Sequence, residues 1–97
     1  MKVVEHEPAS WFLLVEGQEY YLDVRCSLAG FSLYLLIKLD KEERGRFQFL
    51  GKDYAEALAQ QVQLFPQAFY NRNQAVEIQK AVSGATLNWS RSRVIPV

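Results

Sequence analysis

Few residues of this chain have side chains suited to chemistry, and they are scattered. The one histidine, His6, lies between Glu5 and Glu7, and the one cysteine, Cys26, lies in an alternating apolar stretch. A metal site needs several ligands at set spacings, which a single Glu-His-Glu triplet does not supply. A reactive thiol needs exposure and a nearby base or cation, whereas the alternation predicts a core position for Cys26. We therefore expect neither a metal nor a cofactor.

Three carboxylates, Glu16, Glu19 and Asp23, gather around a predicted turn. Paired catalytic acids need contrasting surroundings, but both ends of this turn are polar, which predicts a solvated hairpin. The sequence also lacks a glycine-rich phosphate loop, a Ser/His/Asp set and a Cys-x-x-Cys pair. Together these observations predict a protein that is not an enzyme.

Basic and aromatic residues are mixed in the C-terminal part. Residues 61–97 carry four basic and one acidic side chain, whereas residues 1–60 carry seven basic and ten acidic ones. Arginine and aromatic side chains can hold phosphates and stack on bases. This pattern gives one alternative hypothesis, a weak single-stranded nucleic-acid-binding domain, against the simpler interpretation that the tryptophan is a core residue and the arginines are solvated. Its contacts would be Tyr70, Arg72, Trp89, Arg91 and Arg93.

Three stretches have the patterns of β-strands. Residues 11–16 begin with a continuous apolar run, and residues 19–27 and 31–39 alternate apolar and polar side chains with a period of two. Gly17 and the Ala29-Gly30 pair supply turns between them. The sequence therefore predicts a three-stranded antiparallel β-meander.

A long amphipathic helix is predicted for residues 41–65. Its apolar side chains recur every three or four residues and are Phe47, Leu50, Tyr54, Leu58, Val62 and Phe65. Asp40 and Glu43 form a predicted capping box at the start, and Pro66 ends the hydrogen-bond ladder. Gly45 and Gly51 weaken this interpretation. The alternative is that residues 46–50 are a fourth strand, because Phe47 and Phe49 alternate with polar residues.

A second, shorter helix is predicted to begin after the N-cap residue Asn73 and to cover residues 74–83, or to continue to residue 89 if Ser83-Gly84 do not end it. The predicted fold is thus α+β, with the order β-β-β-α-α and the long helix packed on one face of the meander. We expect a single domain over residues 1–97, with loose termini at residues 1–9 and 90–97.

Composition narrows the classes of partner. The chain is 49% hydrophobic, has a net charge of zero and contains one cysteine. These values predict a core without disulfides and a reducing compartment, the cytoplasm, with nothing that favours nucleic acid or an anionic membrane. No apolar run reaches the length of a membrane span, and residues 1–10 do not resemble a signal peptide.

The sheet face that the long helix does not cover carries more apolar side chains than a solvated surface requires. We predict that this face is an interaction surface, formed by Tyr21, Arg25, Tyr34, Leu36 and Lys38. A non-catalytic protein-interaction module of the regulatory, adaptor or toxin-neutralising type is therefore the leading hypothesis, with an unknown protein partner. A homodimer would bury the same face by two-fold symmetry. The alternative is that the second helix covers it within one chain.

Overall fold

The centre of the molecule is a four-stranded antiparallel sheet. The computed structural model describes residues 1–93, apart from the side chains of Leu28, Ser92 and Arg93. The strands follow one another in the sheet as they do in the chain, and they are β1 (Lys2–Glu7), β2 (Trp11–Glu16), β3 (Glu19–Leu28) and β4 (Phe31–Lys38). The predicted α+β class, the meander and its three strands are confirmed, with almost unchanged bounds.

The fourth strand comes from the N-terminal residues, so the prediction of three strands and of a loose segment at residues 1–9 was wrong. Strand β1 pairs with β2, and its ladder shifts register between Val3 and Glu5. Val3 packs against the core, and the Met1 ammonium group lies 2.6 Å from the carboxylate of Glu16. The charges of residues 5–7 concealed this strand because an edge strand tolerates polar side chains that a central strand does not.

The predicted long helix is two helices. Helix α1 (Lys41–Leu50) begins at the expected capping box, in which Asp40 and Glu43 each accept a hydrogen bond from the other's backbone N–H at 2.8 Å. Gly51 then has φ 70° and ψ −145°, outside helical geometry, and α2 (Lys52–Leu64) follows. Residues 46–50 are helical, so the alternative of a strand there is wrong.

The break at Gly51 changes which apolar residues are buried. Helix α2 buries Leu58 and Val62 against the sheet, together with two alanines, whereas α1 buries no residue. Leu50 and Phe65, both predicted on the buried stripe, are 53% and 62% exposed. A continuous helix would have kept all these side chains in one stripe, and the change of direction turns the first half away from the sheet.

The C-terminal helix is longer than predicted. A 3-10 helix, η1 (Pro66–Arg72), precedes α3 (Val76–Arg93), so Ser83-Gly84 do not end the helix and it runs beyond residue 89. Residues 90–93, predicted to be loose, belong to α3, and residues 94–97 lie outside the described part. Between η1 and α3 the chain crosses the edge of β4, where Leu36 N–H donates to Asn73 Oδ1 at 2.8 Å and Gln74 N–H donates to the Leu36 carbonyl at 3.0 Å.

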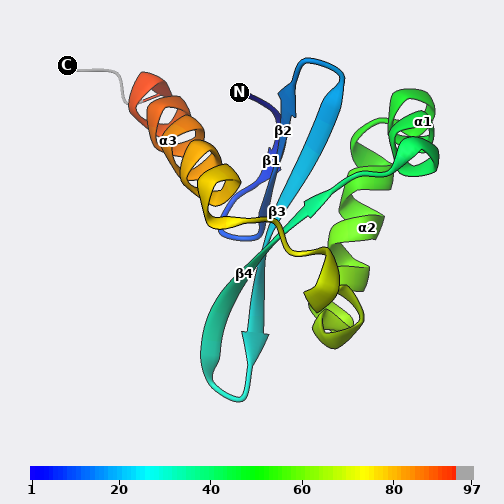
Figure 1. Ribbon diagram of the computed structural model, residues 1–97, viewed down its shortest axis with the longest axis vertical. Coiled ribbons are helices and arrows are strands. Elements are labelled where there is room, and N and C mark those ends of the chain that lie inside the picture. The colour runs from blue at the N-terminus through cyan, green and yellow to red at the C-terminus, as the bar shows by residue number, and fades with distance from the viewer. Residues whose placement is uncertain (94–97) are drawn as a thin grey trace.

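This crossing places helices on both faces of the sheet, α1 and α2 on one side and α3 on the other (Figure 1). The larger core lies under α2 and contains Trp11, Leu13, Leu22, Val24, Cys26, Leu35, Ile37, Leu39, Ala55, Leu58, Ala59 and Val62. The smaller core lies under α3 and contains Leu14, Tyr21, Leu36 and Val82. The α3 side is therefore the less completely filled of the two.

Candidate binding site

The predicted interaction face lies on the α3 side of the sheet. Three cross-strand pairs of β3 and β4 form it, namely Tyr21 with Lys38, Asp23 with Leu36, and Arg25 with Tyr34. Successive pairs at a spacing of two residues point to the same face, so these side chains form two adjacent rows. The register thus puts the five predicted residues on one face, and their part in an interaction stays a prediction.

Helix α3 covers only part of this face. Tyr21 and Leu36 are buried in the smaller core with Val82 of α3, whereas Arg25, Tyr34 and Lys38 remain exposed. Tyr21 and Leu36 of the apolar patch assigned to a homodimer are thus covered within one chain, as in the alternative interpretation, whereas Tyr34 is not. Apart from Lys38, what stays open is the half of the face nearer the β3–β4 turn, which carries Arg25 and Tyr34.

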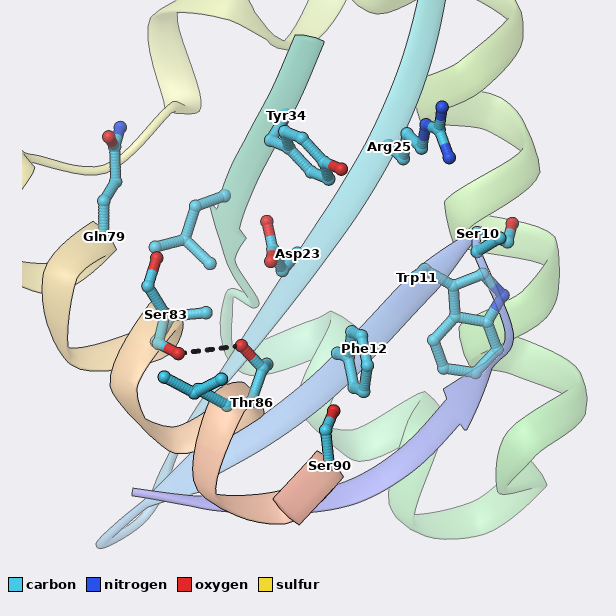
Figure 2. Close-up of a pocket in the computed structure, with 14 residues that line it drawn as sticks. Ser10, Trp11, Phe12, Asp23, Arg25, Tyr34, Gln79, Ser83, Thr86 and Ser90 are labelled. Atoms are coloured by element: carbon cyan, nitrogen blue, oxygen red, sulfur yellow. Dashed lines mark hydrogen bonds between the residues drawn. The ribbon is translucent and has the colours of Figure 1, made fainter. Parts of the chain in front are cut away.

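A pocket of about 670 Å³ lies between α3 and this face of the sheet. Figure 2 shows Asp23 near its centre, with Phe12 and Tyr34 on the sheet side and Ser83 and Thr86 on the helix side. Pockets of a few hundred to a thousand Å³ that combine apolar walls with a few polar groups are typical of ligand sites. The volume and the mixed lining therefore make this pocket the principal candidate site.

Asp23 is the carboxylate of this pocket, and its surroundings differ from those predicted. It lies in the middle of β3 opposite Phe12 and Leu36, not in a solvated hairpin. Desolvation by burial raises the pKa of Asp23 to about 6. Among the described residues no hydrogen bond or ion pair to its side chain is present. The other two carboxylates of the predicted cluster lie elsewhere, Glu16 beside the Met1 ammonium group and Glu19 beside Arg44 at 3.2 Å.

The end of the β3–β4 hairpin extends past the helices on both sides (Figure 1). Phe31 is 74% exposed and Tyr34 is 61% exposed. Phe31 alternates with Leu33 and Leu35, a pattern that favours a core position, but the structure leaves it exposed. The strand is longer than the helix that packs on it, so its first residue has no cover.

The outer edge of β4 is used along only part of its length. Leu36 and Lys38 present their backbone groups outward, where they bond with Asn73, Gln74 and Arg72. In an antiparallel strand every second residue points its N–H and C=O the same way, so Ser32 and Tyr34 also present theirs outward. Within residues 1–93 no hydrogen bond to these groups is present. This half of β4 is therefore an open sheet edge.

The two chemically distinctive residues, His6 and Cys26, are held apart by the sheet. Cys26 is buried in the larger core, as expected, and burial raises the pKa of its thiol. His6 lies on the opposite side with Phe12 and Trp89, and its ring centroid is 4.5 Å from that of the Trp89 ring. The structure therefore does not bring the histidine and the thiol together.

The basic and aromatic residues of the nucleic-acid hypothesis are also separated. Tyr70 and Arg72 belong to η1, whereas Trp89 and Arg91 lie near the end of α3, at the opposite end of the molecule (Figure 1). The guanidinium group of Arg72 donates to Glu43 at 2.5 Å and to the Lys38 carbonyl at 2.9 Å. The hydrogen bond to Glu43 raises the pKa of Arg72. The side chain of Arg93, the last member of the set, lies outside the described part.

Sequence reasoning missed Asp23, Ser83 and Thr86 as residues of one site. An acidic residue at a position that alternates with Tyr21 was the available signal, because Asp is disfavoured in strands. No comparable signal linked it to α3, which lies about sixty positions later in the chain.

Among residues 1–93 no group of His, Cys, Asp and Glu side chains is arranged to hold a metal ion. No helix in the same range has the length and apolar character needed to cross a membrane. Comparison with protein-family models, with curated proteins and with solved structures found no match to this chain. Any function must therefore be argued from the site itself.

Proposed function

We propose that this protein is a non-catalytic protein-interaction module of the cytoplasm, and that it binds an extended strand of a partner protein along the open half of β4. The observation that carries the proposal is the unpaired edge at Ser32 and Tyr34, next to an edge segment that the chain itself already fills. An added strand gains main-chain hydrogen bonds from such an edge.

The chain provides its own example of this pairing. Asn73 forms an isolated antiparallel bridge with Ile37, and Gln74 donates to the Leu36 carbonyl. A partner strand would continue the same line toward the β3–β4 turn. Residues 31–35 contain no Pro and no Lys, the residues that commonly protect an edge from added strands.

The side chains around this edge also fit a protein partner. Phe31 and Tyr34 are the large exposed residues of the hairpin end, and Arg25 lies beside Tyr34 on the neighbouring strand. Tyrosine and arginine are enriched among the residues that carry most of the energy of protein interfaces. Main-chain pairing would supply affinity, and these side chains would supply specificity.

Substitution of Tyr34 by proline tests strand addition directly. The Tyr34 N–H points outward, so proline removes a donor from the open edge and leaves the β3–β4 ladder intact. Binding partners captured from the native cell extract by the wild-type protein should be lost with Tyr34→Pro. Tyr34→Thr is the matched control, because both variants remove the aromatic ring but only threonine keeps the N–H, so Tyr34→Thr should retain more of the capture than Tyr34→Pro. Equal capture by wild type and Tyr34→Pro would overturn the proposal.

A second copy of the chain is the other occupant that this edge would accept. Sedimentation equilibrium separates the two cases. A mass near 11.2 kDa across the micromolar range, which is that of a monomer, would assign the edge to a different protein. A concentration-dependent doubling of mass that Tyr34→Pro abolishes would assign the edge to a homodimer instead.

A further inference from the structure

The pocket between α3 and the sheet has the features of a site for a positively charged group. Asp23 is its one carboxylate among the described residues, and it points into the space between the sheet and the helix (Figure 2). The surrounding walls combine the apolar side chains of Phe12, Leu36 and Val82 with hydroxyl groups from the helix. A carboxylate in such surroundings is costly to the fold unless a cation compensates it.

No cation of the described chain fills this role. Among the described residues, Arg25 is the only basic one that lines the pocket, and its guanidinium group is directed away from Asp23 in Figure 2 and donates to Ser32 Oγ at 3.3 Å. The residues that α3 contributes to the lining are uncharged. Tyr34 is the remaining titratable group of the lining, and Phe12 and Leu36, the residues paired with Asp23 on either side, carry no charge.

We infer that this pocket binds an alkylammonium group, with Asp23 as its counter-ion. An ammonium group has three divergent donors and therefore needs acceptors from several directions. Asp23 and Tyr34 offer oxygen atoms from the sheet, and Ser83 and Thr86 offer hydroxyl oxygens from α3. The planar fork of a guanidinium group instead prefers one carboxylate approached edge-on.

The apolar walls define what is attached to the ammonium group. Phe12, Leu36 and Val82 would pack against a short chain of methylene groups, as in a free alkylamine or the end of a lysine side chain. The ammonium chemistry is the same in both, so the source is a matter for experiment. The inference does not rest on the proposed strand addition, because the counter-ion Asp23 and the hydroxyl groups of α3 take no part in pairing along the open edge, although the Tyr34 side chain borders both sites.

Nuclear magnetic resonance titration with n-butylamine at pH 7 and low salt tests the site. The amide signals of the pocket residues around Asp23, Phe12 and Val82 should shift with saturation. Asp23→Asn should weaken this binding at least about tenfold, since it removes the negative charge of the proposed counter-ion. Asp53→Asn is the matched control, because it changes the net charge equally at an exposed position of α2. Equal loss of binding in the two variants would overturn the inference.

Two further measurements separate charge recognition from apolar filling. The uncharged isostere n-butanol should cause no comparable shifts, and equal binding of the alcohol would overturn the inference. Amine affinity should also fall about tenfold from pH 7 to pH 5, because Asp23, with a pKa of about 6, becomes protonated while the amine stays charged. Affinity that is independent of pH would exclude Asp23 as the counter-ion.

A short peptide with one central lysine identifies the source of the ammonium group. Tighter binding of the peptide than of n-butylamine, at the same pocket signals, assigns the site to a lysine of a polypeptide. Tighter binding of the free amine assigns it to a small molecule. Loss of both with Asp23→Asn is required in either case.

Discussion

At the scale of single residues, Asp23 is the clearest conflict between local preference and position. Strand interiors disfavour Asp, and this one is desolvated between Phe12 and Leu36 without a partner among the described residues. Such a residue weakens the fold, and a binding role is the physical reason we assign to it.

Asp23→Asn should therefore stabilise the free protein at pH 7. The folded pKa of about 6 lies above the unfolded value of 3.8, so the folded state binds the proton more tightly. The resulting contribution to stability is present below pH 4 and is lost as pH rises through about 6. After allowance for partial exposure, we expect the variant to gain about 1–2 kcal/mol at pH 7.

Urea denaturation at pH 4 and pH 7 measures this difference. At each pH, the free energy of unfolding of wild type is subtracted from that of Asp23→Asn. This difference removes the contribution of the other carboxylates, which titrate in both proteins. A gain of equal size at the two pH values would show that the carboxylate charge is not its cause.

Leu58 tests the packing of α2. It is 6% exposed in the larger core, so Leu58→Asp buries a charge without a partner and should cost more than about 4 kcal/mol, enough to unfold the domain. Leu64→Asp, on the same helix but 71% exposed, should change stability by less than about 0.5 kcal/mol. Circular dichroism with thermal denaturation distinguishes the two, and similar losses would contradict the assigned face.

At the scale of elements, one glycine decides how the helical region packs. Gly51 has φ 70° and ψ −145°, a conformation that is available almost only to glycine. Gly45 lies inside α1, and a Cβ atom at either position would meet nothing within 4 Å beyond the adjoining residues and the backbone of its own helix. The two positions therefore differ in backbone conformation and not in available space.

We expect opposite effects from alanine at these two positions. Gly51→Ala should destabilise the protein by about 1–3 kcal/mol, the cost of a strained backbone. Gly45→Ala should stabilise it by up to about 1 kcal/mol, because alanine is the better helix former. Chemical denaturation of both variants provides the measurement. Stabilisation by Gly51→Ala would show that α1 and α2 join into the single helix suggested by the sequence.

At the scale of the whole molecule, the two cores are unequal. Among the described residues, twelve buried ones form the core under α2 and four form the core under α3, and Val82 is the only one of these four that the helix contributes. Elements with few buried apolar contacts open at lower free energy than the rest of a fold. Helix α3 should therefore open before the sheet does.

Native-state hydrogen exchange should show weaker protection in α3 than in β3 and β4. Val82→Asp should abolish protection in α3 and leave the protection of the central strands unchanged. Ala81→Asp, at the neighbouring exposed position, should leave protection unchanged in both α3 and the strands. Simultaneous loss of protection in all elements on Val82→Asp would mean that the protein opens as one cooperative unit.

The sequence by itself determined the local elements. The period-two alternation of residues 19–27 and 31–39 predicted two strands and the face that α2 covers, and Asp40 with Glu43 predicted the start of α1. These features depend on neighbours a few positions apart, for which hydrogen-bonding and burial preferences are strong.

Tertiary structure decided the rest, because the deciding contacts join distant residues. Residues 2–7 became a strand through pairing with β2, and the crossing of Asn73 past Leu36 brought α3 to the second face of the sheet. The burial of Asp23 depends on that crossing, since Ser83 and Thr86 enclose the pocket only once α3 is in place. Local periodicity is the same for a face covered by a helix of its own chain and for one left to a partner, so only the fold distinguishes them.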